Sequence, residues 1–249
     1  MKALITGASS GIGADMARIL DKRGYDLILV ARRKEKLERL KAELKNNVEI
    51  IVMDISSTFN CMKLYNKTKK EDIDILINSA GFGIFGKFVE TNLDKELDMI
   101  DLNVKSLHIL TKLFLKDFKE KNKGYILNVA SAAAFLPGPL MATYYGTKAY
   151  VLRLTQSINE ELKKDNSNVY IGAMCSGPVN TEFNNVAGVK FSIKSLESYD
   201  AAMYTLNKMF KGKTLIIPGY FMKIGIFINR LIPYKMQAQI SYNLQKNKN

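Results

Sequence analysis

The stretch KALITGASSGIG, from Lys2 to Gly13, decides the fold of this chain. A short apolar run ends in three glycines with the spacing G-x-x-x-G-x-G, and a helical pattern begins within them. We expect Gly7 to form a tight turn, Gly11 to let the backbone approach a pyrophosphate, and Gly13 to let the helix pack close to the sheet. The free N–H groups at a helix N-terminus attract phosphates. A purely structural turn is the alternative, because the spacing differs from G-x-G-x-x-G.

Short apolar runs alternate with longer segments of helical periodicity along the whole chain. This alternation is typical of βα units and a parallel sheet. The predicted strands are Lys2–Thr6, Asp26–Val30, Val48–Met53, Ile73–Asn78, Tyr125–Ala130, Val169–Met174 and Thr214–Ile217. The predicted helices are Ile12–Arg23, Lys34–Lys45, Phe59–Lys70, Leu93–Lys121, Tyr144–Lys164 and Tyr199–Phe210.

No repeat, low-complexity tract or linker divides the 249 residues. We therefore predict one domain over residues 1–249, with an α/β, doubly wound fold in which helices flank a seven-stranded parallel sheet. In such folds ligands bind outside the carboxyl ends of the strands, so the residues that follow each predicted strand are the candidates for a functional site.

Composition argues against several other classes of protein. The formal net charge is +13, but the basic residues are scattered, so we expect a lysine-rich surface and no nucleic-acid partner. Cys61 and Cys175 form no C-x-x-C pair or histidine cluster, which indicates reduced cytoplasmic thiols and no metal site. The apolar run from Tyr220 to Ile232 is interrupted by charges and is shorter than the about 20 residues of a membrane span.

The end of the second predicted strand, in LILVARRKEKL, indicates which dinucleotide is bound. In NAD sites an acidic residue at this place binds the ribose 2′-hydroxyl, whereas arginine accommodates a 2′-phosphate. The only acid, Asp26, lies at the opposite end of the strand, and Arg32 and Arg33 occupy the expected place. The sequence therefore favours NADP(H). The alternative is that both arginines are solvated surface charge.

Two further strand ends offer contacts to a cofactor. Asp54, in VMDIS, is placed either to accept a hydrogen bond from an adenine amino group or to cap the following helix. NSAG, from Asn78 to Gly81, is expected to form a turn in which small residues leave room for the cofactor. Asn78 itself has a structural alternative, in which its amide joins two neighbouring strands.

The stretch YYGTK, from Tyr144 to Lys148, is the candidate for acid and base chemistry. Tyr144 and Lys148 are four residues apart and so are neighbours on one face of a helix, while spacing alone does not exclude Tyr145. A phenol has a pKa near 10 and holds its proton at neutral pH. A nearby ammonium, together with an oxidised nicotinamide, would lower that pKa. The phenol would then act as an acid in carbonyl reduction or as a base in alcohol oxidation.

Two other polar residues are expected close to this pair. Ser131, in NVASAAAF, follows the fifth predicted strand, where its hydroxyl can donate to a developing alkoxide. Asn103, in DLNVKSLHIL, lies inside a helical pattern, where its amide can hold a water or brace the backbone for a proton relay. An asparagine inside a helix is ordinarily exposed, so Asn103 alone indicates no function.

Taken together, these motifs resemble the short-chain dehydrogenase/reductase family over essentially the whole chain. The motifs are T-G-x-x-x-G-x-G at Thr6–Gly13, N-S-A-G at Asn78–Gly81, Asn103, Ser131, Y-x-x-x-K at Tyr144–Lys148 and SGPVNT at Ser176–Thr181. Ser79 and Ser176 replace an asparagine and a proline that are usual in the family, and both are small. The resemblance implies a Rossmann fold and an NADP-preferring bacterial oxidoreductase.

The resemblance also assigns roles to individual residues. It implies a catalytic tetrad, and the gap of three residues before the lysine selects Tyr144 over Tyr145. The tetrad is Asn103, Ser131, Tyr144 and Lys148. The cofactor-binding residues expected from the motifs and the resemblance are Gly7, Ser9, Ser10, Gly11, Ile12, Gly13, Arg32, Arg33, Asp54, Ile55, Asn78, Ala80, Gly81, Tyr144, Lys148, Gly177, Val179 and Thr181.

The implied reaction is direct hydride transfer between nicotinamide and a carbonyl or alcohol. In the family, Ser131 would polarise the substrate oxygen and Tyr144 would deliver the proton. Lys148 would tune the tyrosine and hold the nicotinamide ribose, and Asn103 would connect the site to solvent. The resemblance further implies that Thr181 fixes the carboxamide. With no metal expected, these hydroxyls must meet the charge that develops on oxygen.

Apolar segments border the predicted site and suggest a bulky apolar substrate. They are FGIFGKF at 82–88, AAFLPGPLM at 133–141 and the stretch 183–191 within a variable substrate lid at about 182–198. The alternative is that Phe88 and Leu136 belong to the core. A C-terminal tail at about 218–249 has an apolar helical face with basic flanks. It is suited to cover the pocket, to contact a neighbouring subunit or to lie on a membrane, and we favour the first two.

Two other functions compete with the reductase. A regulator that senses NADP(H) without turnover would bind the cofactor but would not need the tyrosine and lysine together. An epimerase or dehydratase of the related larger enzymes is disfavoured, since 249 residues leave no room for a substrate domain. The resemblance implies a cytoplasmic homodimer or homotetramer built through the helices at Leu93–Lys121 and Tyr144–Lys164, with a small-molecule substrate as the other partner.

Overall fold

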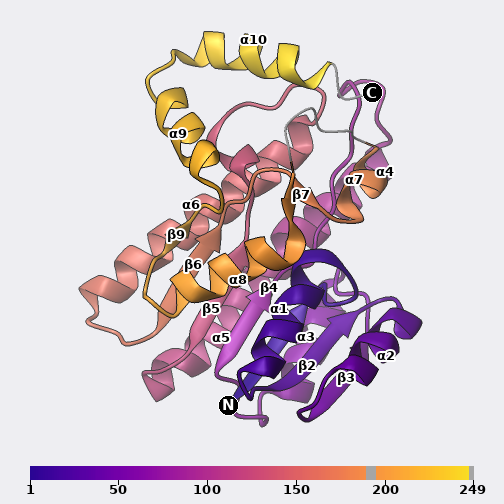
Figure 1. The fold of residues 1–249 in the computed structure, drawn as a ribbon, viewed down its shortest axis with the longest axis vertical. Helices are drawn as coiled ribbons and strands as arrows, with labels where there is room; N and C mark the ends of the chain where they lie inside the picture. The colour runs from indigo at the N-terminus through magenta and orange to yellow at the C-terminus, as the bar shows by residue number, and fades with distance from the viewer. Residues whose placement is uncertain (189–194, 247–249) are drawn as a thin grey trace.

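The computed structural model describes residues 1–188 and 195–246, which form a central parallel sheet covered by helices on both faces (Figure 1). The sheet has seven strands in the order β3-β2-β1-β4-β5-β6-β9. The strands are β1 (Lys2–Thr6), β2 (Asp26–Ala31), β3 (Val48–Val52), β4 (Ile75–Asn78), β5 (Tyr125–Val129), β6 (Tyr170–Met174) and β9 (Leu215–Ile216). All neighbouring pairs are parallel, so the predicted doubly wound α/β fold is confirmed.

The helices follow the strands in alternation, as the periodicity predicts. The helices that cover the sheet are α1 (Gly11–Lys22), α2 (Lys34–Glu43), α3 (Thr58–Thr68), α5 (Leu107–Lys121), α6 (Ala142–Lys164) and α8 (Ser198–Met209). The other helical segments are α4 (Leu93–Ile100), η1 (Asp101–Ser106), η2 (Ala132–Phe135), α7 (Phe183–Ala187), α9 (Tyr220–Asn229) and α10 (Tyr234–Gln245). Two short strands, β7 (Val179–Asn180) and β8 (Leu196–Glu197), pair outside the main sheet.

Residues of β1 alternate between two hydrophobic cores because successive side chains of a strand point to opposite faces. Ala3 and Ile5 pack in the core that contains residues of α1, α2 and α8. Leu4 packs in the other core, which contains residues of α3, α5 and α6, including Phe114. Both faces are apolar, as expected for a parallel sheet that is covered on both sides.

The predicted helix Leu93–Lys121 is interrupted in the structure. It consists of α4, the π-helical segment η1 and α5. The hydroxyl of Ser106 donates to the carbonyl oxygen of Asp101 at 2.9 Å and also to that of Ile55. Such side-chain bonds compete with the regular helical ladder, and π-helical turns of this kind occur often at functional sites.

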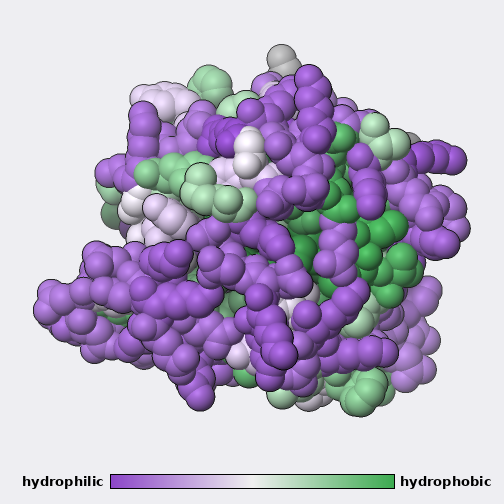
Figure 2. Space-filling model, turned by 90° about the horizontal axis from the view of Figure 1, so that it is seen from below, coloured by the Kyte–Doolittle hydropathy of each residue, from purple (hydrophilic) through white to green (hydrophobic). Residues whose placement is uncertain are grey.

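Two predicted surface segments are only partly described. The predicted lid at about 182–198 contains α7 and β8, and its residues 189–194 lie outside the described residues. The predicted tail at about 218–249 forms α9 and α10, and residues 247–249 lie outside the description. The helices α9 and α10 lie together at one end of the molecule (Figure 1). The surface of the opposite end is mostly hydrophilic, with a hydrophobic area on one side (Figure 2).

A buried amide network joins the two central strands β4 and β5. The Nδ2 atom of Asn78 donates to the Oδ1 atom of Asn128 at 2.9 Å and to Thr111 at 3.1 Å. Asn128 is fully buried, and its own Nδ2 donates to Thr155 at 3.0 Å. The network confirms that Asn78 clamps the strands, and it holds the sheet beside the turn of NSAG.

We expect Asn128→Ala to destabilise the protein more than an ordinary surface change. Its removal takes one hydrogen bond from each of the buried residues Asn78, Thr111 and Thr155, and a buried polar atom left unpaired costs about 1–3 kcal/mol. Chemical denaturation should give a free energy of unfolding lower by about 2 kcal/mol or more. The exposed Asn66→Ala on α3 serves as the control and should stay within about 0.5 kcal/mol of the wild type. Equal losses in the two variants would contradict the role of the network.

Candidate functional site

The glycine turn after β1 lies directly against the end of β4. Gly7 has a φ of +67°, which a residue with a side chain rarely adopts. A Cβ atom at Gly7 would lie 2.7 Å from the backbone of Ala80, and one at Gly13 would lie 2.6 Å from the carbonyl oxygen of Gly7. The hydroxyl of Thr6 accepts a hydrogen bond from the Ser79 N–H at 3.2 Å. The predicted tight turn and close helix packing are therefore both present.

The N-terminus of α1 has the features that phosphate binding requires. Ser10 is its N-cap residue, but the Ser10 side chain makes no capping hydrogen bond, and no acidic residue occupies the first turn. The backbone N–H groups of this turn, which includes the half-buried Ile12, therefore remain available to an anion. A Cβ atom at Gly11 would lie 2.9 Å from the Thr181 side chain, so Thr181 lies across the same turn.

A cluster of charged side chains lies beside the glycine turn. The Arg33 guanidinium donates to the hydroxyls of Ser9 at 3.0 Å and Ser10 at 2.9 Å. It also pairs with Glu182 at 2.7 Å, and Lys36 pairs with the same carboxylate. These hydrogen bonds from Lys36 and Arg33 lower the pKa of Glu182 to about 2. The structure thus brings together the predicted Arg33, Ser9 and Ser10.

Lys36 and Glu182 also belong to this cluster, although the sequence did not predict them there. Lys36 follows Arg33 by three residues, which would place both on one side of the turn into α2, but the lysine-rich sequence gave no reason to single it out. Glu182 is distant in sequence and reaches the cluster only because the chain returns past the glycine turn after β7. The Glu182 carboxylate pairs with both Arg33 and Lys36, so a phosphate that bound these two cations would have to displace Glu182 from them.

Asp54 and Ile55 follow β3 and have different surroundings. The Asp54 carboxylate accepts from the Ser56 N–H at 3.0 Å and lies 3.6 Å from exposed Arg32. It does not cap α3, because the N-cap of that helix is Ser57, which accepts from the Asn60 N–H. Ile55 is buried in the core, so its side chain has little surface to offer a ligand.

Tyr144, Ser131 and Lys148 converge at the carboxyl ends of the central strands. Tyr144 and Lys148 are both buried on α6, and the Lys148 Nζ atom lies 5.8 Å from the centre of the Tyr144 ring. The same Nζ atom donates to the carbonyl oxygen of Val129, at the end of β5, at 2.9 Å. Ser131 follows β5, and its hydroxyl is near enough to favour ionisation of the Tyr144 phenol. A Cβ atom at Gly81 would lie 3.5 Å from that Nζ atom.

Lys148 alone does not produce the lowered Tyr144 pKa that the sequence predicts for a phenol beside both an ammonium and an oxidised nicotinamide. Burial raises the pKa of Tyr144, and the nearby Ser131 hydroxyl opposes this increase only in part. Burial also lowers the pKa of Lys148 from 10.5 to about 8. The reason is that both side chains are shielded from water, which disfavours the charged form of each. Tyr144 therefore holds its proton at neutral pH and is suited to donate it.

Asn103 lies in η1 and is buried, with 1% of its surface exposed. Its amide braces the loop after β4 from both sides, because Oδ1 accepts from the Phe82 N–H at 3.1 Å and Nδ2 donates to the Phe82 carbonyl at 2.9 Å. Nδ2 also donates to Thr147 on α6 at 3.1 Å. The predicted bracing role agrees with this geometry, and it ties the loop at Gly81 to the helix that carries Tyr144.

Apolar side chains from all three predicted border segments gather around Tyr144. The Phe183 ring lies 5.3 Å from the Tyr144 ring, and both belong to a cluster that includes Met141 and, at its edge, Phe82. Phe88 does not belong to this cluster and is 66% exposed, so Phe88 neither lies in the core nor borders the candidate site. The predicted residue Phe191 lies outside the described residues.

Tyr145 has surroundings that differ from those of Tyr144. A Cβ atom at Gly138 would lie 2.1 Å from the Tyr145 ring, so the ring packs flat against that glycine. Burial raises the pKa of Tyr145 to about 12, and neither Ser131 nor Lys148 contributes to this shift. Tyr145 is thus a packing residue, and the tyrosine that meets the serine and the lysine is Tyr144.

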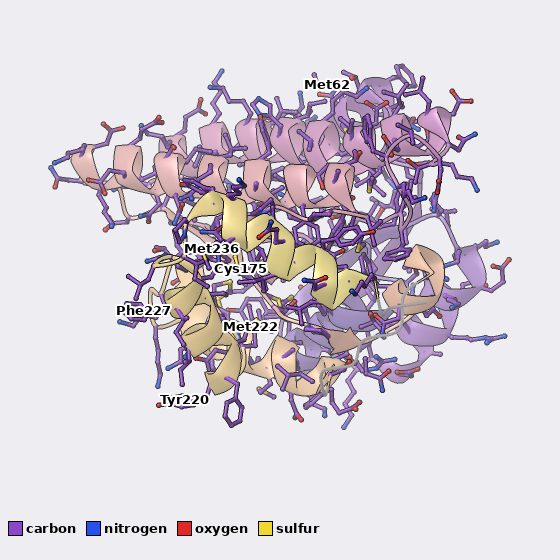
Figure 3. The ribbon with its side chains drawn as sticks, turned by 90° about the horizontal axis from the view of Figure 1, so that it is seen from above. Met62, Cys175, Tyr220, Met222, Phe227 and Met236 are labelled. Carbon is purple, nitrogen blue, oxygen red and sulfur yellow. The ribbon has the colours of Figure 1, made fainter. Side chains whose placement is uncertain are left out.

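The loop after β6 connects the site to the C-terminal helices. Gly177 lies under α9, since a Cβ atom there would lie 2.2 Å from the terminal methyl carbon of Met222. Figure 3 shows α9 and α10 lying over this end of the protein, with Met222 and Cys175 labelled. Val179, the first residue of β7, is buried. Gly177 and Val179 therefore hold the segment that leads to Thr181.

Among the described residues, no group of histidine, cysteine, aspartate or glutamate side chains is placed to hold a metal ion.

The sequence resembles known families over most of its length. The family described as short chain dehydrogenase matches residues 1–190. An uncharacterized oxidoreductase of Staphylococcus epidermidis is 30% identical over 211 residues, which cover 83% of this chain and 90% of the relative.

Two solved structures resemble this one closely. A short-chain dehydrogenase from Sphingobium yanoikuyae, in complex with NADPH, has a TM-score of 0.82 and 32% identity, covering 88% of each chain. A bulky-bulky ketone specific alcohol dehydrogenase from Comamonas testosteroni has a TM-score of 0.79 and 28% identity, covering 92% of this chain and 91% of its own.

Lys148→Met should change how stability depends on pH. The folded protein releases the Lys148 proton at a pH of about 8, whereas the unfolded chain holds it to about 10.5. Between these values the unfolded state binds more protons, so the wild type gains stability as pH rises, by at most about 1.4 kcal/mol per pH unit. Below a pH of about 8, Lys148 is charged in both states, and the full cost of burying the cation applies. The methionine variant should therefore have a higher free energy of unfolding than the wild type at neutral pH, and this difference should shrink as pH rises.

Urea unfolding of both proteins at several pH values between about 7 and 10 measures this difference. The exposed Lys163→Met on the same helix is the matched control, since its side chain is 62% exposed. It should give a difference that stays near zero at every pH. A pH-independent difference for Lys148→Met would contradict the burial of a titrating lysine.

Proposed function

Because the chain belongs to the short-chain dehydrogenase family, we propose that this oxidoreductase is an NADP(H)-dependent carbonyl reductase or alcohol dehydrogenase. The observation that carries the proposal is the convergence of Tyr144, Ser131 and Lys148 beside the glycine turn after β1. A phenol, a hydroxyl and a cation at the carboxyl edge of a doubly wound sheet are suited to proton transfer at a carbonyl oxygen.

Each residue of the site has a separate role in the proposed reaction. When bound, a nicotinamide supplies the hydride in reduction or takes it up in oxidation. The Ser131 hydroxyl donates to the carbonyl oxygen and so stabilises its developing negative charge. Tyr144 delivers its proton to that oxygen, and its raised pKa keeps it protonated until the oxygen becomes a stronger base. Lys148 holds positive charge next to Tyr144 and favours the phenolate that is left.

The glycine turn and the α1 N-terminus fit the phosphates of a dinucleotide. The uncapped N–H groups of α1 face the turn, and the close contacts at Gly7 and Gly13 leave no space there for side chains. We propose that Arg33, with Ser9 and Ser10, binds a ribose 2′-phosphate and so favours NADP(H). The NADPH complex of the related Sphingobium structure supports this preference.

We propose that the substrate is bulky and apolar. The support is the cluster of Phe82, Met141 and Phe183 around Tyr144, which would bury apolar groups on either side of a carbonyl. The ketone specificity named for the related Comamonas enzyme agrees with this. The predicted lid at 182–198 would then close over the substrate, with α7 as its described part.

Assembly and location are part of the proposal. We propose a homodimer or homotetramer formed through α4, α5 and α6, because Leu93, Leu97 and Ile100 on α4 expose apolar surface. A cytoplasmic location is supported by Cys61 and Cys175, which are buried free thiols. Light scattering that finds a monomer would contradict the proposed assembly.

Tyr144→Phe should abolish catalysis while it leaves cofactor binding near normal. The phenylalanine keeps the ring packing but removes the proton, so we expect a loss of about 10²- to 10⁴-fold in NADPH oxidation with any accepted carbonyl. Tyr145→Phe, its neighbour, is the control and should retain activity. NADPH binding, measured by fluorescence titration, should be similar in all three proteins.

Full activity of Tyr144→Phe would remove Tyr144 from this role. The wild type should first be screened with NADPH against a panel of ketones and aldehydes that differ in size. Tight NADPH binding without turnover of any of them would overturn the reductase and favour a protein that senses NADP(H).

Arg33→Ala should weaken NADPH binding by about tenfold or more and change NADH binding little, because it removes charge-assisted hydrogen bonds to a 2′-phosphate. Glu182→Gln should have the opposite effect. It releases Arg33 and Lys36 from their carboxylate, and exposed ion pairs contribute about 0.2–1 kcal/mol, so NADPH should bind up to about fivefold more tightly.

Dissociation constants for NADPH and NADH in both single variants and in the double variant test this arrangement. In the Arg33→Ala background, Glu182→Gln should lose most of its effect. If NADH binds the wild type better than NADPH, Arg33 has been misinterpreted.

A further inference from the structure

The helix α10 turns its polar face inward and its apolar face outward. Gln237, Ser241 and Gln245, which are four residues apart, are at most 5% exposed. On the outer side Met236 is 51% exposed and Leu244 is 59% exposed. A surface helix of a globular protein ordinarily has the reverse arrangement, with apolar residues toward the core. The orientation of α10 therefore needs an explanation outside the chain itself.

Hydrogen bonds fix this orientation. The Gln237 side chain donates to the carbonyl oxygen of Asn229 at 3.0 Å and to that of Ile232 at 2.7 Å, which ties α10 to the end of α9. Asn229 in turn donates to the carbonyl oxygen of Phe135 at 3.2 Å, which ties α9 to η2 next to the site. Gln237 thus ties the polar face to the rest of the protein, and Gln245 donates to Ser241 at 3.2 Å within that face. On the apolar face Met236, Ile240 and Leu244 remain 43–59% exposed.

The exposed face continues from α10 onto α9. Phe221 is 88% exposed, Leu231 75%, Tyr234 84% and Phe227 63%, and in Figure 3 Tyr220 and Phe227 point outward from α9. We call this outward surface of α9, α10 and their connection the C-terminal face. It lies at the end of the molecule opposite to the mostly hydrophilic end of Figure 2. Large contiguous apolar surfaces of this kind mark sites of interaction.

The charge of this region determines which partner fits. Residues 201–249 contain no aspartate or glutamate. Their basic residues are Lys208, Lys211, Lys213, Lys223, Arg230, Lys235, Lys246 and Lys248. Lys223, Arg230 and Lys235 lie within the C-terminal face and are exposed. A partner must therefore offer an apolar layer together with negative charge.

We propose that the C-terminal face binds the surface of a membrane that contains anionic phospholipids. Aromatic and aliphatic side chains such as Phe221 and Leu231 would enter the boundary of the acyl chains, and the basic side chains would meet the phosphate headgroups. A second copy of this chain fits less well, because a symmetric contact would bring the same cations together. Among the described residues no helix is long and apolar enough to cross a bilayer, so the binding is to the surface.

This proposal differs from the preference drawn from the sequence, which favoured a lid or a subunit contact for the tail. Periodicity locates an apolar face on a helix but does not say whether that face turns inward. The structure places α9 next to Gly177 and η2, so the tail does lie beside the candidate site. Met222 and Ile226 of α9 pack inward, but the other large apolar residues of the tail, such as Phe221 and Leu231, are exposed.

Sedimentation of the full-length protein with vesicles tests the proposal. Vesicles of phosphatidylcholine with about a third phosphatidylserine should bind the protein, vesicles of phosphatidylcholine alone should bind it at least about tenfold more weakly, and added salt should release it. The variant with Phe221→Ser, Phe227→Ser and Leu231→Ser should lose binding. The variant with Lys223→Gln, Arg230→Gln and Lys235→Gln should bind at least about tenfold more weakly.

Matched controls carry the same changes elsewhere. Phe59→Ser, Phe88→Ser and Val89→Ser remove three apolar side chains that are 74%, 66% and 88% exposed. Lys67→Gln, Lys87→Gln and Lys163→Gln remove three exposed charges. Both controls should bind anionic vesicles like the wild type, and thermal unfolding should find every variant folded.

Two results would overturn the proposal. One is a wild type that fails to bind anionic vesicles, and the other is equal loss of binding in the controls. Light scattering without lipid tests the alternative that a second copy of this chain covers the C-terminal face. If the serine variant of the C-terminal face converts an oligomer to a monomer and vesicles are not bound, the face is a contact between copies of this chain.

Discussion

The burial of one cation, Lys148, is the constraint on which the candidate site depends. Its ammonium is shielded from water and donates to the carbonyl oxygen of Val129, and because burial lowers its pKa to about 8, it is mostly charged only below that pH. In this buried position α6 holds the Lys148 Nζ atom 5.8 Å from the centre of the Tyr144 ring. Burial raises the tyrosine pKa at the same time. A buried pair of this kind, with opposite shifts, is typical of functional sites.

The surrounding structure keeps that pair at the edge of the sheet. The π-helical turn at η1 directs the Asn103 amide toward both backbone groups of Phe82, and Asn103 also contacts α6. The loop after β4 is therefore held between the glycine turn on one side and α6 on the other. Rigid strands and helices thus hold Tyr144, Lys148 and the glycine turn in a fixed arrangement.

The periphery of the site is built differently from its centre. Glu182 links the chain after β7 to Arg33 and Lys36, so the segment that leads into the lid and the cationic cluster are joined by exposed charges. Exposed ion pairs are weak and easily exchanged, in contrast to the buried contacts around Tyr144. The C-terminal helices add a third kind of surface, whose polar anchors face the protein and whose apolar side chains face outward.

The sequence alone predicted the parallel sheet and the glycine turn, because these depend on periodicity and local spacing. Spacing left Tyr144 and Tyr145 as alternatives, and the choice of Tyr144 with Ser131, Lys148 and Asn103 came from the resemblance to the family. The sequence could not determine the direction of the Tyr144 pKa shift, which burial decides through contacts distant in the chain. Nor could it place Glu182 beside Arg33, or turn the polar side of α10 inward. Each of these depends on which surfaces meet after folding, and only the tertiary structure sets the solvent exposure and the neighbours of a charge.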